Sequence, residues 1–189
     1  MPLQKVDKEQ IIKDSLRVFK ERGYHKTSMA DIGNACGLLK GSIYHYFKGK
    51  EELMEAVIDY LTSYYQNKVF SVKNNTDLTA EEKLEFLISK SEDIFLTDKG
   101  GCLMASIGLE TVNVVPVFTT KIRSFFNSWI TCFESIFSET HSATTARELA
   151  EYGVAEIEGS VMLMQLFQDE KYLKNAHTRI LNQFQNSRQ

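Results

Sequence analysis

The sequence predicts an all-α fold in which an N-terminal three-helix unit of the helix-turn-helix type precedes a larger helical unit, with about nine helices in all. Only two of the 189 residues are proline and 43% are apolar, a composition that suits ordered helices. Apolar residues recur three and four positions apart, as on one face of a helix, and polar clusters separate these runs. We expect the two units to cover residues 1–50 and 51–189.

Two short helices joined by a glycine turn are predicted at the end of the first unit. Thr27 or Ser28 can cap the first helix, and Asp31 stands where a capping box has its acidic residue. Gly37 can adopt the left-handed conformation that ends this helix. The second helix is expected from about Lys40 to Phe47.

This second helix combines an apolar face with polar groups. Ile43 and Phe47 are four residues apart and are expected to face inward. The side chains left for the other faces can hydrogen-bond to bases or phosphates: Lys40, Ser42, Tyr44, His45 and Tyr46. A helix-turn-helix that reads DNA lays its second helix in the major groove. Singly, the aromatic residues fit a half-buried patch equally well and the lysines fit an ordinary surface, so the joint spacing carries the prediction.

Helical periodicity continues through the larger unit. A long helix with Leu53, Val57, Leu61 and Tyr64 on one face should run to about Phe70. Further helices are expected near residues 84–95, 102–114, 117–137, 145–168 and 172–185. The 117–137 stretch has apolar residues on several faces, as in a helix enclosed by its neighbours. Thr144 or Thr145 can cap the helix that follows.

Residues 8 to 60 carry a string of motifs that few families share. They are Ile12, Leu16 and Phe19, then Gly23-Tyr24, Thr27-Ser28-Met29, Asp31-Ile32, Gly37, Lys40 to Phe47, and Lys50-Glu51-Glu52-Leu53. In this string the chain resembles the TetR family of bacterial transcriptional regulators.

The resemblance implies a role for nine of these residues. Positions matching Thr27, Ser28, Tyr46 and Lys50 usually touch phosphates, and those matching Lys40, Gly41, Ser42, Tyr44 and His45 lie in or beside the major groove. Lys50 also stands near a helix start, where the helix dipole does not favour a cation, so an outside phosphate is expected there. Leu39 departs from the family, which commonly has a small residue such as Ser or Thr at this position, so the first turn of the recognition helix lacks its usual cap.

The charge distribution supports double-stranded DNA as a partner. Residues 1–50 contain ten Lys and Arg against five Asp and Glu, whereas the remainder contains twelve against twenty. Binding of a polyanion depends on local potential, so the net charge of −3 does not exclude it.

A second copy of the chain is the other expected macromolecular partner. The predicted helix 145–168 has Gly153, Gly159 and Ser160 among apolar neighbours, followed by Val161 to Met164, Leu166 and Phe167. This is more apolar surface than a small unit readily hides, although core packing is the alternative. The resemblance implies a homodimer through the two C-terminal helices, which would present two recognition helices to a palindromic operator.

A small, mostly hydrophobic effector is expected to bind the larger unit. Large side chains near the 117–137 helix are candidates for its pocket, or for plain core: Phe95, Met104, Phe118, Phe125, Trp129, Phe133, Tyr152 and Met162. Glu110 lies in an apolar segment. Its carboxylate would select a cationic or hydrogen-bonding effector, pair with Lys121 or Arg123, or be exposed.

Together these features predict a sequence-specific transcriptional regulator, a repressor released from its operator by the effector. The alternatives are a ligand-independent DNA binder and a dimeric helical adaptor that has lost DNA binding. An enzyme, a cofactor and a metal site are not expected, because the sequence has no nucleophile–base order, no metal-ligand spacing and no glycine-rich phosphate loop. Cys36, Cys102 and Cys132 are expected to be buried small hydrophobes. The polar N-terminus predicts a cytoplasmic protein.

Overall fold

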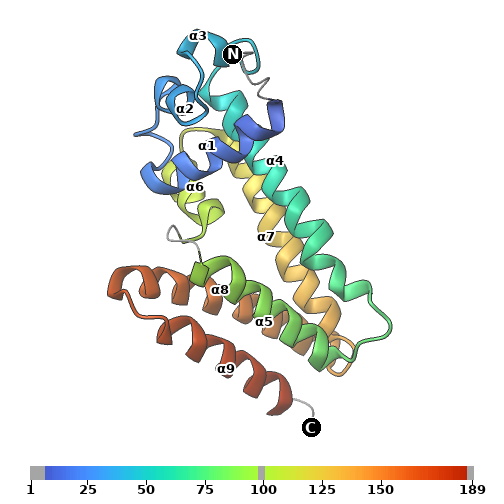
Figure 1. The fold of residues 1–189 in the computed structure, drawn as a ribbon. Coiled ribbons are helices and arrows are strands. Elements are labelled where there is room, and N and C mark those ends of the chain that lie inside the picture. The colour runs from blue at the N-terminus through green and yellow to red at the C-terminus, as the bar shows by residue number, and fades with distance from the viewer. Residues whose placement is uncertain (1–6, 98–100, 187–189) are drawn as a thin grey trace. The chain divides into compact units, whose positions relative to one another are not determined.

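The computed structural model describes residues 7–97 and 101–186, apart from the side chain of Lys40. In these ranges it contains nine α-helices and one short 3-10 helix, η1 (Figure 1). The predicted all-α fold is therefore confirmed. The helices form two compact units, one of residues up to 63 together with 103–122, the other of residues 64–102 and 123 onward. The first unit extends past residue 50, because it includes the start of α4 and the whole of α6.

The first unit has a compact apolar core. It is built from α1 (Lys8–Arg22), α2 (Met29–Ala35), α3 (Lys40–Ile43), the start of α4 (Lys50–Lys68), α6 (Leu103–Thr111) and the start of α7 (Pro116–Phe137). Its most buried side chains include Ile11, Phe19, Ile32, Ile43, Phe47, Leu53, Val57 and Ile107. Burying each such side chain stabilises the fold by about 1.5–3 kcal/mol. Because α2 and α3 are too short to be stable alone, this packing holds them in place.

Local signals set the ends of the first helices. Ser28 caps α2 by accepting the N–H of Asp31, and Asp31 accepts the N–H of Ser28 in return, so the predicted capping box is confirmed. Gly23 follows α1 with φ 76°, and Gly37 follows α2 with φ 65°. Both values lie where side chains other than glycine are strained.

The recognition helix is shorter than predicted. α3 ends at Ile43, and a turn continues to Phe47. The N–H groups of Tyr46 and Phe47 both donate to the Ile43 carbonyl, at 2.9 and 3.1 Å, so the chain tightens there instead of continuing as an α-helix. Leu39 at the N-cap makes no side-chain hydrogen bond, which leaves the first turn without the support of a cap. Ile43 and Phe47 are buried, as predicted.

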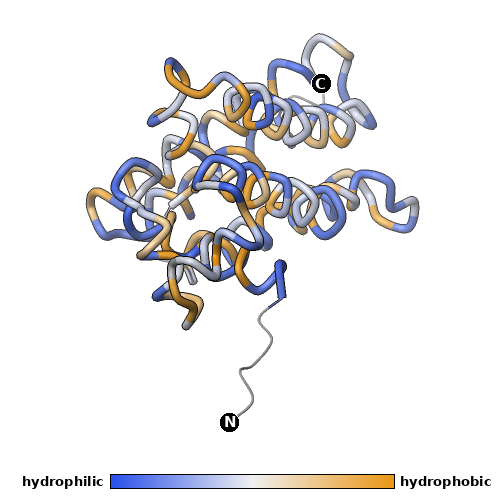
Figure 2. Tube along the Cα trace, turned by 90° about the horizontal axis from the view of Figure 1, so that it is seen from above, coloured by the Kyte–Doolittle hydropathy of each residue, from blue (hydrophilic) through white to orange (hydrophobic). Residues whose placement is uncertain are grey.

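The second unit is organised around aromatic side chains. It contains the end of α4, η1 (Phe70–Asn74), α5 (Ala80–Thr97), the rest of α7, α8 (Ala143–Phe167) and α9 (Lys171–Asn186). Tyr65, Phe70, Phe125 and Trp129 contact one another with ring centroids 5.1–6.3 Å apart. Figure 2 shows hydrophobic and hydrophilic residues interspersed along the helices, as amphipathic elements require.

Two details of the second unit correct the sequence-based expectations. α7 is not enclosed on every face, because Ser124, Asn127 and Thr131 are exposed on it. They help to line an open polar groove of about 500 Å³. The cap of α8 is Ser142 in place of Thr144 or Thr145, since its hydroxyl accepts the Thr145 N–H at 3.3 Å.

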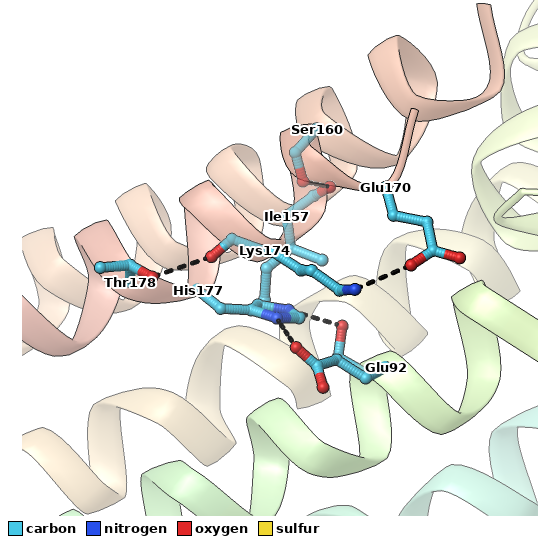
Figure 3. Close-up of polar contacts among 8 residues, drawn as sticks. Glu92, Ile157, Ser160, Glu170, Lys174, His177 and Thr178 are labelled. Atoms are coloured by element: carbon cyan, nitrogen blue, oxygen red, sulfur yellow. Dashed lines mark hydrogen bonds and ion pairs between the residues drawn. The ribbon is translucent and has the colours of Figure 1, made fainter. Parts of the chain in front are cut away.

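A buried histidine ties α9 to α5. His177 is only 3% exposed. Its Nδ1 lies 3.2 Å from Glu92 Oε1 and its Nε2 lies 3.0 Å from Ser91 Oγ, and Figure 3 shows Glu92 and His177 facing each other. Burial lowers the pKa of His177, and Glu92 opposes this shift. The neutral imidazole therefore serves here as a hydrogen-bonding element of the core.

Two further findings concern the described residues. Their helices include none with the length and apolar character needed to span a bilayer. Nor do their His, Cys, Asp and Glu side chains gather into a cluster suited to a metal ion. All three cysteines are buried. Burial raises the pKa of Cys36 to about 11 and that of Cys132 to about 12.

Candidate nucleic-acid interface

Polar and aromatic side chains surround α3 on its exposed side. Tyr44 is 45% exposed, Gly41 and His45 are exposed, and Ser42 and Tyr46 are half-buried. The buried Ile43 and Phe47 hold this segment against the core from behind. The structure thus brings together five of the predicted contact residues on one short segment. Lys40, also predicted, has a side chain outside the described part of the structure.

The two residues before α2 have different environments. Ser28 is exposed and its hydroxyl serves the capping box. Thr27 is only 2% exposed, and its hydroxyl donates to the Gly23 carbonyl at 2.7 Å. The expected phosphate contact from the Thr27 side chain is therefore corrected, since the hydroxyl is buried and already bonded inside the unit. Ser28 keeps the exposure that such a contact needs.

Lys50 has a structural role that the sequence did not reveal. Its Nζ donates to the Tyr24 carbonyl at 2.8 Å and lies 4.3 Å from the centroid of the Tyr24 ring. Burial lowers the pKa of Lys50, and the nearby Glu110 carboxylate opposes this. An ammonium group has three donors, so one bond to Tyr24 leaves others for a phosphate. Lys50 is thus held where α4 begins, beside the turn that enters α2.

Glu110 holds the turn between α1 and α2 in the first unit. Its Oε2 accepts the N–H groups of Tyr24 and His25, at 3.0 and 3.1 Å, and its backbone carbonyl lies 3.1 Å from His25 Nε2. Phe118 packs edge-on against Tyr24, with centroids 5.2 Å apart. Both expected effector contacts are corrected, because these side chains hold the α1–α2 turn. Sequence spacing gave no signal for this, since Glu110 and Tyr24 are 86 residues apart.

The remaining effector candidates do not form one pocket. Phe95, Trp129 and Phe133 line a common apolar cavity, which is small at about 10 Å³, the space of roughly one water molecule. Phe125 belongs to the adjoining aromatic cluster, and Met104 is buried in the first unit. The two remaining candidates are exposed on α8 and are corrected as pocket residues: Tyr152 and Met162.

A buried carboxyl group in the second unit was missed. Glu158 Oε1 is shielded from solvent and has no hydrogen-bond partner among the described residues. Burial raises the pKa of Glu158 to about 7, while a hydrogen bond from the Cys102 thiol opposes the shift. No clear signal was present in the sequence, because the neighbours of Glu158 at helical spacing are the buried Val154 and Val161 but also the exposed Ala155 and Met162. Glu158 is half-buried between the core and the exposed face of α8.

An apolar stripe runs along the exposed face of α8 from Tyr152 to Leu166. Tyr152, Ala155, Gly159, Met162 and Leu166 are all exposed and follow one another at intervals of three and four residues. This is the spacing of a seam between paired helices. Small residues at its centre allow a close approach of backbones.

Comparisons with known proteins match two parts of the chain to families of transcriptional regulators. Residues 11–57 match the family model described as "Bacterial regulatory proteins, tetR family". Residues 81–179, more than half of the chain, match "Transcriptional regulator LmrA/YxaF-like, C-terminal domain". The chain is 24% identical to the HTH-type transcriptional repressor DhaR of Mycobacterium sp. (strain GP1), over 84% of this chain and 82% of that protein. It is 29% identical to the uncharacterized HTH-type transcriptional regulator YxaF of Bacillus subtilis (strain 168), over 81% and 75%.

A solved structure shows the same fold. A TetR transcriptional regulator from Legionella pneumophila superposes with a TM-score of 0.86 at 22% identity, covering 95% of this chain and 97% of that one. The family models place the N-terminal match on α1 to α4 and the second match on α5 to α9. With the exposed polar segment around α3, these findings show that the chain belongs to the TetR family of bacterial helix-turn-helix transcriptional regulators, a family of DNA-binding proteins and not of enzymes.

Proposed function

We propose that this regulator is a cytoplasmic repressor that binds a palindromic operator as a homodimer and is released by a small, mostly hydrophobic effector. The observation that carries the DNA part is the exposed segment from Gly41 to Tyr46, backed by the buried Ile43 and Phe47. Repression is favoured by the similarity, over 84% of this chain, to a protein named as a transcriptional repressor.

The proposed DNA contacts fall into two groups. Tyr44 and His45 are the most exposed side chains of the segment, so we assign them to the base edges together with Lys40, Gly41 and Ser42. Ser28, Tyr46 and Lys50 are assigned to phosphates, which fix the position of the helix on the duplex.

Homodimerisation is proposed through α8 and α9. The exposed seam of α8 ends in Leu166, which is 71% exposed, and Phe167 beside it is 61% exposed. An exposed apolar stripe of this length marks an interaction site. In a two-fold symmetric dimer, the stripe of one subunit is buried against the same stripe of the other subunit. Two recognition segments are then available to two half-sites, which raises affinity and specificity together.

Release by an effector is proposed as a linkage between two binding events. An effector that prefers the arrangement with poor operator spacing lowers operator affinity by its differential affinity for the two arrangements, about 1–3 kcal/mol in typical cases. The apolar cavity lined by Phe95, Trp129 and Phe133 is the proposed effector-binding site, and it must widen to admit a ligand.

The test begins with selection of bound fragments from random duplex DNA, followed by fluorescence anisotropy over a range of salt concentrations. Tyr44→Ala and His45→Ala are expected to change the preferred sequence, by about 1–3 kcal/mol at each base that loses a contact. Lys50→Met is expected to weaken all sequences alike and to reduce the salt slope. Lys68→Ala, at an exposed lysine near the end of α4, is the matched control and should change neither.

Contrary outcomes point to the two alternatives. Specific binding that no tested small molecule alters identifies a ligand-independent DNA binder. Failure to select any sequence identifies a dimeric adaptor that has lost DNA binding. Leu39 favours this alternative, because it gives α3 no side-chain cap and is 82% exposed.

A further inference from the structure

Glu158 on α8 is half-buried, and its carboxyl group has no cationic partner among the residues that the structure describes. Its Oε1 is shielded from solvent and meets no hydrogen-bond donor among the described residues. The Cys102 thiol donates to the carboxyl group, and no ion pair of the described residues includes it. A buried carboxylate without a cationic partner is destabilising for the free protein.

The surroundings of Glu158 connect it to the apolar cavity. Tyr65 on α4 is 8% exposed, and its pKa is raised by burial first and then by the proximity of Cys102 and Glu158. Tyr65 also lines the cavity, together with Ile157, the residue next to Glu158 on α8. Tyr65 thus belongs both to the cavity lining and to the surroundings of Glu158, whereas Glu158 itself is not one of the lining residues.

Aromatic rings form much of that wall. Phe70 and Trp129 line the cavity, and both contact Phe125, which also packs against Tyr65. Aromatic faces attract organic cations, most strongly in sites without water. Two features thus favour a cation over a neutral or anionic molecule: the aromatic faces that line the cavity, and the nearby Glu158 carboxyl group, which has no cationic partner among the described residues.

We propose that Glu158 is the anchor for the ammonium group of an apolar organic cation, whose body occupies the cavity lined by Tyr65, Phe70 and Trp129. The proposal rests on the proposed function in that this cation is the class of effector to which the repressor responds. Because the cavity holds about 10 Å³ in the free chain, the ligand widens it by moving side chains. The destabilisation of the unpaired carboxyl group is then relieved on binding.

Three probes with one apolar body test the preference for charge. They are 3-phenylpropylammonium, 3-phenylpropan-1-ol and 3-phenylpropanoate, titrated into the full chain. Calorimetry measures affinity, and quenching of Trp129, the single tryptophan, reports binding at the cavity. The cation is expected to bind at least about ten-fold more tightly than the alcohol, since hydrogen bonds to charged groups exceed neutral ones by this margin. The carboxylate should not bind.

Glu158→Gln keeps the size of the side chain and removes its charge. This variant is expected to bind the cation about ten- to hundred-fold more weakly and to bind the alcohol with unchanged affinity. Glu151→Gln is the matched control, because Glu151 is on the same helix but exposed and paired with Arg147. It should affect neither probe. Equal affinities for the three probes, undiminished cation binding by Glu158→Gln, or no cation binding at all would each overturn the proposal.

Thermal unfolding without ligand gives a second, independent readout. A shielded carboxyl group that lacks a cationic partner and accepts a weak donor, the Cys102 thiol, can be replaced with little loss. Glu158→Gln and Glu158→Met are therefore expected to unfold at about the same temperature as the parent chain or higher. A large decrease in both variants would show that Glu158 has a structural partner within the chain, which overturns the assignment.

Operator binding separates this proposal from the function on which it rests. Glu158→Gln should bind the selected operator like the parent chain. If the cation binds through Glu158 but leaves operator affinity unchanged, the site is correct and the effector-controlled repressor is wrong. If the cation releases the parent chain and the Glu158→Gln variant from the operator equally, the proposed function is correct and the proposed Glu158 site is wrong.

Discussion

Gly23 and Glu110 are expected to be energetically coupled, because one carboxylate both bonds to the α1–α2 turn and occupies the space beside the glycine. A Cβ added at Gly23 would lie 2.6 Å from Glu110 Oε1, which is too close for real atoms. Gly23→Ala therefore displaces the carboxylate from the Tyr24 and His25 N–H groups, in addition to the strain of φ 76°.

The magnitudes follow from these two effects. Backbone strain at positive φ amounts to about 1–2 kcal/mol. The two hydrogen bonds share one oxygen and are partly exposed, so we take about 1.5–3 kcal/mol for both together. Gly23→Ala should then lower the free energy of unfolding by about 2.5–5 kcal/mol and Glu110→Ala by about 1.5–3 kcal/mol. The double variant should lose no more than Gly23→Ala alone, because the same hydrogen bonds are removed in both.

Urea denaturation of the four proteins of this cycle measures the free energies, and hydrogen exchange at Tyr24 and His25 shows whether the loss is local. Operator affinity should fall in the same order, since the turn positions α2. Additive losses, equal within about 0.5 kcal/mol to the sum of the single changes, would refute the shared-carboxylate explanation.

Three further changes have defined outcomes. Ser28→Ala removes the cap of α2 and should lower the free energy of unfolding by about 1 kcal/mol, measured by urea denaturation; an unchanged midpoint would contradict the capping role. Leu166→Glu should convert the proposed dimer into a folded monomer in light scattering, and a persistent dimer would exclude the α8 seam. Burial lowers the pKa of His177, so the stability that this residue confers is full above its ordinary pKa of about 6.5 and is lost as the pH falls through the lowered value. The urea midpoint should thus decrease on acidification more steeply than in His177→Gln, and parallel profiles would contradict this.

Local sequence signals predicted the helices of the first unit well. The capping box of Ser28 and Asp31 and the break at Gly37 depend on residues within a few positions of one another, so spacing alone identifies them. The predicted length of α3 was wrong, because the N–H groups of His45 and Tyr46 donate to carbonyls only three residues back, those of Ser42 and Ile43. Such tight bonds cannot be deduced from residue types.

The candidate sites depended more on contacts between distant segments. Lys50 meets Tyr24 across 26 positions, and Glu110 meets it across 86. No periodicity links such pairs, so the apolar neighbourhood of Glu110 left an effector contact, an ion pair with Lys121 or Arg123 and exposure as alternatives, and none of them included Tyr24. Tyr152 and Met162 were misplaced for a related reason, since an apolar residue on a helix can face the core or a partner chain. Exposure, which only the fold provides, decides between the two.

The bond from Glu110 to the α1–α2 turn has a practical consequence for domain exchange. A headpiece cut after residue 63 would lack α6 and the first turns of α7, and with them the acceptor for two backbone amides and the ring that covers Tyr24. A chimaera that carries the N-terminal 63 residues on another regulator therefore also needs residues 103–122 as a second insert. The alternative is a recipient in which the segment corresponding to 103–122 has an acidic side chain at the position of Glu110.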